Sequence, residues 1–253
     1  MNGGGAIVAA AVSVLLFMAL NTITGIRLLG LARRTHELPE LYLGLAHLLA
    51  GALGWAMLLF ASLVEHYGSH PVATLLMICG IGCLNVGHAA IALFAWRVFS
   101  PRTRWLVVPF ALLVLTLLVD FVHNGLMTHL FAPPTDTFWF WPGMVSRTFA
   151  WMWLMAVTLP SSRKLQRQVP LGLVDAQTAN RMFLMFLASA FLVLLCFVVN
   201  TASLLGTWTT HPLTMATVSE LLAVPSAICS LLAFVPPRAY TDWIARRAPV
   251  VAE

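Results

Sequence analysis

A few ionisable residues lie inside otherwise apolar stretches of the chain, and the sequence singles out these residues as able to do chemistry. Arg147, Asp120 and Glu220 lie in different stretches, and because an unpaired charge in apolar surroundings is costly, Arg147 is expected to pair with Glu220, with Asp120 or with both. Such a pair either fixes the packing of two helices or forms part of a polar pocket in which Arg147 faces an anionic or polar ligand group. The second interpretation predicts a ligand-binding site formed by Asp120, His123, Arg147, Asn200 and Glu220.

Four further polar residues form a second set in the half of the bundle that is predicted to face the cytoplasm. Two of them are three residues apart and therefore share a helical face. Hydrogen bonds between helices are the ordinary role of such residues in a membrane, but the set could also supply a path for a solute. Histidines on facing helices could alternatively ligate haem. This inner polar set consists of Asn21, His47, Asn85 and His88.

Histidines near the predicted outer boundary raise the question of a metal site. Imidazole and carboxylate ligands suit zinc or copper, and the spacing of His66 and His70 would suit one helical turn. Gly68 and Pro71 argue against a continuous helix there, and solvated loop histidines are the simpler interpretation. The weak metal candidates are His66, His70, His123, His129 and His211.

No sequence motif predicts catalysis or a bound cofactor. The patterns GxSxG, HExxH, GxGxxG and the P-loop are absent. The only lysine, Lys164, is predicted in a cytoplasmic loop, so no lysine within a predicted membrane span could form a Schiff base, and a retinal-binding protein is excluded. The cations are distributed over short loops rather than gathered on one basic face, which argues against nucleic acid as a partner.

The elements that must position these residues are long apolar helices. The chain of 253 residues is 60% hydrophobic and only 9% charged, whereas soluble domains have about 25% charged residues. Apolar runs of about 20 residues match the thickness of a bilayer core, and a helix satisfies all the backbone hydrogen bonds of such a run. The expected spans are 6–31, 41–64, 71–99, 104–122, 138–160, 181–205 and 213–235.

These spans predict an all-α polytopic membrane protein, with a seven-transmembrane helix bundle over residues 1–236 and a short basic cytoplasmic tail over 237–253. Every lysine and arginine other than Arg147 then falls on one side of the membrane, whereas six or eight spans would scatter them. The positive-inside rule places that side in the cytoplasm and the N-terminus outside. The longest outer loop, 123–137, could fold as a lid or simply connect two helices. Short loops without cysteine pairs favour a bacterial inner membrane.

Three stretches at the predicted cytoplasmic boundary resemble those of known membrane proteins. They are LARRT at 31–35 with LPEL at 38–41, WRVFSP at 96–101, and PPR at 236–238 followed by Trp243. As a set they resemble uncharacterised bacterial seven-transmembrane proteins. The last stretch resembles the exit from seven-span sensor regions that precede histidine kinase or diguanylate cyclase modules. The resemblance implies sensing, and because no output module follows Trp243, the signal would pass to a separate cytoplasmic signalling partner.

These features favour a receptor-like or sensor-like protein of the lipid bilayer that binds a small ligand in the outer half of its bundle. A small-solute transporter or permease is one alternative, because the inner polar set could continue a path through the bundle. A metal- or haem-binding membrane redox subunit is the other alternative, because histidines occur in both halves.

Overall fold

Helices account for almost all of the chain in the computed structural model, which describes residues 3–129, 137–207 and 212–247. No strand occurs in this described part, so the predicted all-α fold is confirmed. In chain order the elements are α1 (Gly3–Thr35), α2 (Leu38–Leu48), η1 (Leu49–Leu53), α3 (Gly54–His66), α4 (His70–Phe99), η2 (Arg104–Leu106), α5 (Val107–Asp120), η3 (Phe121–Met127), α6 (Phe140–Gln168), η4 (Val169–Leu171), α7 (Ala176–Leu204), α9 (Pro212–Phe234) and α10 (Arg238–Arg247).

Several of these helical segments are long and apolar enough to cross a membrane. Within the described residues five pass this test by length and composition, or six if α9 and α10, which are bent by 79° relative to each other, are taken as one broken span. The chain is therefore a multi-pass membrane protein. Helix α6 is not among the five because buried polar residues lower the hydropathy of its first half. The five segments are Ala11–Thr35, Leu38–His66, His70–Phe99, Arg104–Met127 and Ala176–Leu204.

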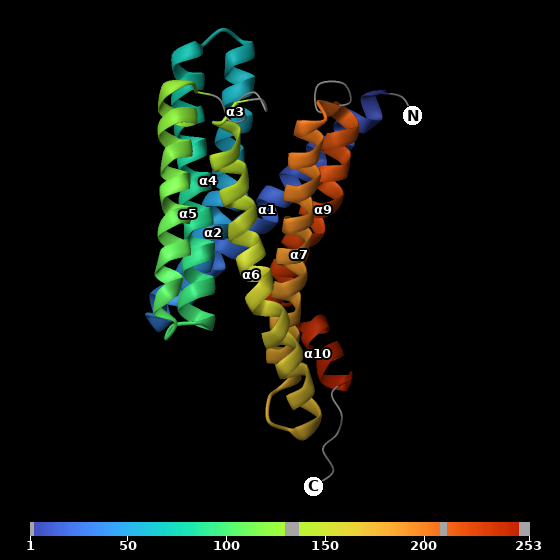
Figure 1. Ribbon diagram of the computed structural model, residues 1–253. Coiled ribbons are helices and arrows are strands. Elements are labelled where there is room, and N and C mark those ends of the chain that lie inside the picture. Colours follow the sequence, from blue (N-terminus) through green and yellow to red (C-terminus); the bar gives the residue numbers. More distant parts are fainter. Residues whose placement is uncertain (1–2, 130–136, 208–211, 248–253) are drawn as a thin grey trace.

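The helices form an elongated bundle in which α6 joins two groups (Figure 1). Helices α2, α3, α4 and α5 make up one group, and α7 and α9 make up the other. Helix α1 crosses the bundle diagonally and contacts both α2 and α9. The largest core cluster lies where the groups meet and includes Ile91 of α4, Leu154 of α6 and Met185 of α7.

The turns between helices alternate between the two ends of the bundle. The turns α1–α2, α4–α5 and α6–α7 lie at the end of the bundle that also holds α10, and the α3–α4 turn lies at the end near the start of α1 (Figure 1). Arginines and Lys164 accompany the first group of turns, so we call that end the basic end and the other the opposite end.

A π-helical segment, η1, interrupts the second apolar stretch. The predicted span 41–64 is one continuous helical segment, Leu38–His66, but with a wider turn in its middle. Gly51 lies in this turn, and a Cβ atom there would come 2.4 Å from Oδ1 of Asn21 on α1. Glycine therefore allows α1 to approach η1 closely, as small residues do between membrane helices.

The ends of the other predicted spans match the structure to within eight residues, and the ends at Phe99 and Arg104 match it fully. The largest difference is at Pro160, where the predicted fifth span ends but α6 continues to Gln168. Proline removes only one helical hydrogen bond, and the helix resumes after it. Helix α7 starts before the predicted 181, because Asp175 caps its first turn by accepting a hydrogen bond from the Thr178 amide. The predicted tail likewise contains a helix, α10.

Candidate functional site

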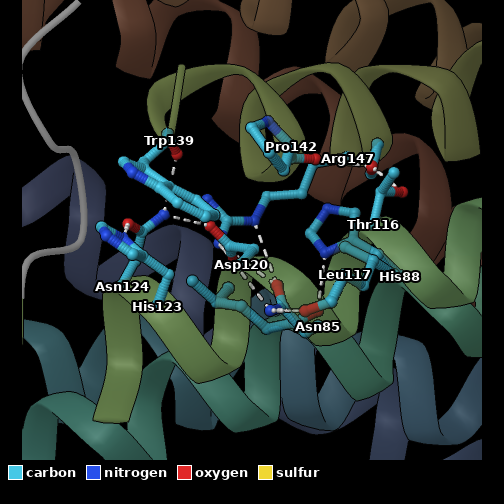
Figure 2. A network of polar contacts seen from close by, with 12 residues as sticks. Asn85, His88, Thr116, Leu117, Asp120, His123, Asn124, Trp139, Pro142 and Arg147 are labelled. Carbon is cyan, nitrogen blue, oxygen red and sulfur yellow. Dashed lines mark hydrogen bonds and ion pairs between the residues drawn. The ribbon is translucent and has the colours of Figure 1, made fainter. Parts of the chain in front are cut away.

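A buried carboxylate, Asp120 at the end of α5, is the centre of the largest polar network in the described chain (Figure 2). Its Oδ2 accepts hydrogen bonds from Nη2 of Arg147 at 2.6 Å and from Nδ2 of Asn85 at 2.8 Å. Its Oδ1 accepts one from Nδ2 of Asn124 at 2.7 Å. Of the two partners that the sequence predicts for Arg147, the structure shows Asp120, while the side chain of Glu220 lies outside its described part.

Asn85 of α4 connects the two charged partners. Its Oδ1 accepts from Nε and Nη2 of Arg147 at 3.3 and 3.2 Å, while its Nδ2 also donates to the carbonyl of Leu117 at 3.0 Å. Both side chains of the ion pair are almost inaccessible, with 0% exposure for Asp120 and 8% for Arg147. Burial of this kind is tolerated when the charges are paired and their remaining hydrogen-bonding atoms are satisfied.

The local structure explains how α6 approaches Asp120 so closely. A Cβ atom at Gly143, in the first turn of α6, would lie 2.2 Å from Oδ1 of Asp120. Only glycine leaves room for the carboxylate against the helix backbone at this point. The first turn of a helix carries the positive end of the helix dipole, which adds to the stabilisation of the carboxylate. On the other side of this contact, the π-helical segment η3 begins at Phe121, the residue that follows Asp120.

His123 and Trp139 form the edge of the network nearest to the opposite end of the bundle. Their rings stack with centroids 3.9 Å apart and an interplanar angle of 6°. Nδ1 of His123 donates to Oδ1 of Asn124 at 2.9 Å, and Nδ2 of Asn124 donates to the carbonyl of Trp139 at 3.1 Å. Figure 2 shows these three residues on one side of Asp120, with Thr116 and His88 on the other. The stacked rings thus connect η3 to the start of α6.

The two other predicted pocket residues, Asn200 and Glu220, belong to α7 and α9. Asn200 on α7 does not contact Asp120; its Nδ2 donates to Oγ1 of Thr148 at 3.1 Å, next to Arg147. Asn200 therefore ties α7 to α6 at the level of the ion pair. Glu220 belongs to α9, but its side chain lies outside the described part of the structure.

The inner polar set divides into three separate groups. Asn85 belongs to the Asp120 network, although the sequence places it with the inner set. Asn21 and His47 form a pair, in which Nδ1 of His47 donates to Oδ1 of Asn21 at 2.8 Å. His88 bonds instead to Trp151 on α6, whose indole N–H donates to Nε2 of His88 at 3.2 Å.

The hydrogen bonds of His88 define its tautomer. Nδ1 lies 2.6 Å from the Leu84 carbonyl, which can only accept, so Nδ1 carries the proton. Nε2 accepts from Trp151, because an indole nitrogen can only donate. Both ring nitrogens are engaged, so binding of iron by His88 would require loss of its bond to Trp151. The alternative of haem between His47 and His88 does not fit this arrangement.

A small cavity lies between the inner groups, with a volume of about 20 Å³. This exceeds the roughly 10–15 Å³ that one water molecule requires. Most of the lining is apolar. The polar side chains that line it are those of His47, Trp151, Ser189 and Ser230.

The histidines proposed as metal ligands do not converge in the described part of the chain. No group of three or more His, Cys, Asp or Glu side chains there has an arrangement that could hold a metal ion. His66 ends α3 and His70 begins α4, so a turn separates them and they do not share a helical turn. Nδ1 of His129 hydrogen-bonds to the Gly125 carbonyl at 2.8 Å. His211 lies outside the described residues. Positions 130–136 of the predicted lid also lie outside them, and the first part of the lid is helical through Met127.

Sequence reasoning did not identify several residues of the network. Asn124 follows Asp120 by four residues, and this spacing on a helix could have revealed it. Thr116 and Ser146, whose hydroxyl oxygens are 2.6 Å apart, join α5 to α6 beside the site and carry no comparable signal. Gly143 carries no such sequence signal either, because its role depends on the approach of another helix.

The comparisons with known proteins leave the site to be interpreted from its own geometry. No protein-family model, curated protein or solved structure matches this chain. The resemblance to seven-span sensor regions therefore stays a prediction.

Proposed function

We propose that this protein is a receptor-like or sensor-like membrane protein whose ligand carries an anionic group and competes with Asp120 for Arg147. The observation that carries the proposal is the ion pair itself, at 2.6 Å, which links α5 to α6 and reaches α4 through Asn85. A ligand anion that replaced Asp120 on Arg147 would release one side of this three-helix connection. A ligand shifts a conformational equilibrium by as much as it prefers one of the two states.

The elements around the pair are suited to such a change. A π-helical segment, η3, begins directly after Asp120, and π-helical turns occur frequently at functional sites. Helix α6 continues from Arg147 to Gln168, so a displacement near the ion pair moves an element that extends to the basic end. Pro160 lies in α6 between Arg147 and Gln168. It has no amide proton to donate within the helix, which favours bending of α6 at this point.

The proposal includes the membrane orientation predicted from the sequence. The bundle would cross the membrane seven times, with α6 and α9 as additional spans and the basic end in the cytoplasm. This orientation is supported by the arginines that are concentrated at the turns of the basic end. The ligand site would then open toward the outside, near the start of α6.

A thermal-shift experiment tests the ligand site. The protein in nanodiscs would be heated with and without glutamate, succinate or inorganic phosphate as anionic probes. A bound ligand at 100 times its Kd stabilises a protein by about 2.7 kcal/mol. We expect one probe to raise the melting temperature of the wild type but not of Arg147→Gln. Arg163→Gln is the matched control, because it removes an exposed arginine from the same helix outside the site.

Asp120→Asn separates the two interpretations of the ion pair. It keeps the shape of the side chain but removes the anion that competes for Arg147, so a binding site would respond at lower probe concentration. A response that persists in Arg147→Gln would place binding elsewhere. If no probe stabilises either the wild type or Asp120→Asn, the pair serves packing alone and the proposal fails.

A permease is the second candidate, and a specific observation favours it. The Asp120 network includes Asn85, and His88 follows three residues later on α4, bonded to Trp151. Trp151 and His47 line the small cavity on the way to the basic end. Accumulation of a probe inside proteoliposomes would select the permease, whereas binding without accumulation would select the receptor.

A further inference from the structure

Helix α10 leaves the bundle at a sharp bend. Helix α9 ends at Phe234, and α10 begins at Arg238 with its axis turned by 79°. Pro236 and Pro237 form the connection and supply no amide protons, which ends α9. The amides of Tyr240 and Thr241 both donate to the Pro237 carbonyl, which starts the new helix. A helix turned this far from a membrane span runs closer to the plane of the membrane surface.

One face of α10 is held against the bundle. Nδ2 of Asn180 on α7 donates to the Tyr240 hydroxyl at 2.9 Å, and Ile244 is 8% exposed. The ring of Trp243 stacks on that of Tyr240, with centroids 5.8 Å apart, yet Trp243 remains 47% exposed. The helix therefore has a fixed position and presents an indole ring beside its docked face.

The other face of α10 is charged and accessible. Arg238 and Arg246 are exposed there, with Asp242 between them. More exposed cations lie on the neighbouring ends of α6 and α7, which Figure 1 shows beside α10. These cations are Arg163, Lys164, Arg167 and Arg181. In the described part of the chain, the only exposed acidic residue at these ends of α6 and α7 is Asp175, so positive charge dominates there.

We propose that α10 lies in the headgroup layer of the membrane and that Arg238 and Arg246 bind anionic phospholipid headgroups. Amphipathic helices with basic residues and an exposed tryptophan adopt this position, and basic residues beside a membrane span attract anionic lipids. Tryptophan is favoured at headgroup depth because its ring is apolar and its N–H is polar. The combination of the 79° turn, the exposed Trp243 and the two arginines favours a lipid over a soluble partner.

Lipid retention measured by native mass spectrometry tests the proposal. The probes are phosphatidylglycerol and phosphatidylcholine, added to the delipidated full-length protein. The double variant Arg238→Gln with Arg246→Gln is compared with Arg33→Gln with Arg34→Gln. The control removes the same charge from two exposed arginines at the end of α1, away from α10 (Figure 1). Because the first variant removes two cations that attract anionic headgroups, it should weaken phosphatidylglycerol binding on the order of tenfold or more.

Three outcomes would overturn the proposal. Equal loss of phosphatidylglycerol in both double variants would show general charge attraction, and no loss in either would show no lipid site. Unchanged lipid binding together with lost binding of a polyglutamate peptide would assign the surface to an acidic protein instead.

Quenching of tryptophan fluorescence by brominated phosphatidylglycerol gives a second measurement that does not depend on the arginine variants. Wild type should be quenched more than Trp243→Phe, and equal quenching would place Trp243 outside the bilayer. Added lipid reaches both ends of the delipidated protein, and brominated phosphatidylglycerol is present in both leaflets of a bilayer, so neither result depends on orientation or on the ligand site at Arg147.

Discussion

At the scale of single residues, the main feature is that four buried polar side chains satisfy one another. The four residues come from four elements: Asn85 from α4, Asp120 from α5, Asn124 from η3 and Arg147 from α6. Each takes part in at least one hydrogen bond within the group. The group can therefore exist at low cost only when these elements are assembled. Removing one member leaves another buried and uncompensated.

We expect Asp120→Ala and Arg147→Gln each to destabilise the protein strongly. Breaking one side of a buried ion pair typically costs about 3–5 kcal/mol. The double variant should lose less than the sum of the two single losses, because neither charge is then left alone. SDS-induced unfolding in detergent measures the free energies, and strictly additive losses would contradict the pairing. Glu65→Gln, which removes an exposed carboxylate near the end of α3, is the control for charge removal.

Gly143→Ala should also destabilise the protein, although it adds only one methyl group. The new Cβ atom would lie 2.2 Å from Oδ1 of Asp120, so the carboxylate or α6 must move. Gly30→Ala is the matched control, because no atom lies within 4 Å of its Cβ position. There the substitution should be neutral or stabilise by about 0.5–1 kcal/mol, as alanine does within helices. Equal unfolding free energies for the two variants would contradict the close contact.

At the scale of elements, helix ends and π-helical turns decide where side chains meet. Segments η1 and η3 each lie beside a polar group, at Asn21 with His47 and at Asp120 with Asn124. Continuous α-helix through either segment would rotate the residues beyond it by part of a turn. Helix α7 provides the clearest capped end, at Asp175.

Asp175→Ala should cost about 1 kcal/mol, as loss of an N-cap does. Hydrogen bonds from the hydroxyl and amide of Thr178 lower the pKa of Asp175 below its ordinary value. The carboxylate thus adds stability that is complete above the ordinary aspartate pKa and disappears as the pH falls through the lowered value. Unfolding measured along a descending pH series should show this loss in wild type. Asp175→Asn, which can still cap, should lack this component, and an unchanged acid profile would contradict the assignment.

At the scale of the whole molecule, the turns between helices alternate between the two ends of the bundle, and this alternation links the distribution of charge in the sequence to an orientation in the membrane. Short connections at the basic end hold the arginines, and the site around Asp120 lies toward the opposite end. Cytoplasmic placement of the basic end would therefore put the proposed ligand site in the outer half of the bundle.

Cysteine labelling tests this orientation. Tyr67→Cys lies in the α3–α4 turn and Leu171→Cys in the α6–α7 turn, at positions that are 80% and 67% exposed. In intact cells a membrane-impermeant maleimide should label the first variant and should label the second only after permeabilisation. The reverse result would invert the orientation, and labelling of both would contradict the span count. The background variant lacks the native residues Cys79, Cys83, Cys196 and Cys229.

The sequence alone determined the class of the molecule and narrowed the partner of Arg147 to Asp120 or Glu220. Long apolar runs predict membrane helices because backbone groups must be satisfied within each span, and two opposite charges within such runs predict a pair. Only the tertiary structure decided that Asn85 joins Asp120 and that His88 bonds to Trp151. Hydropathy defines where a helix is, and spacing defines what shares its face. The rotation, depth and tilt of each helix depend on packing against its neighbours, and the turn of α10 depends on two prolines together with a docking surface on α7.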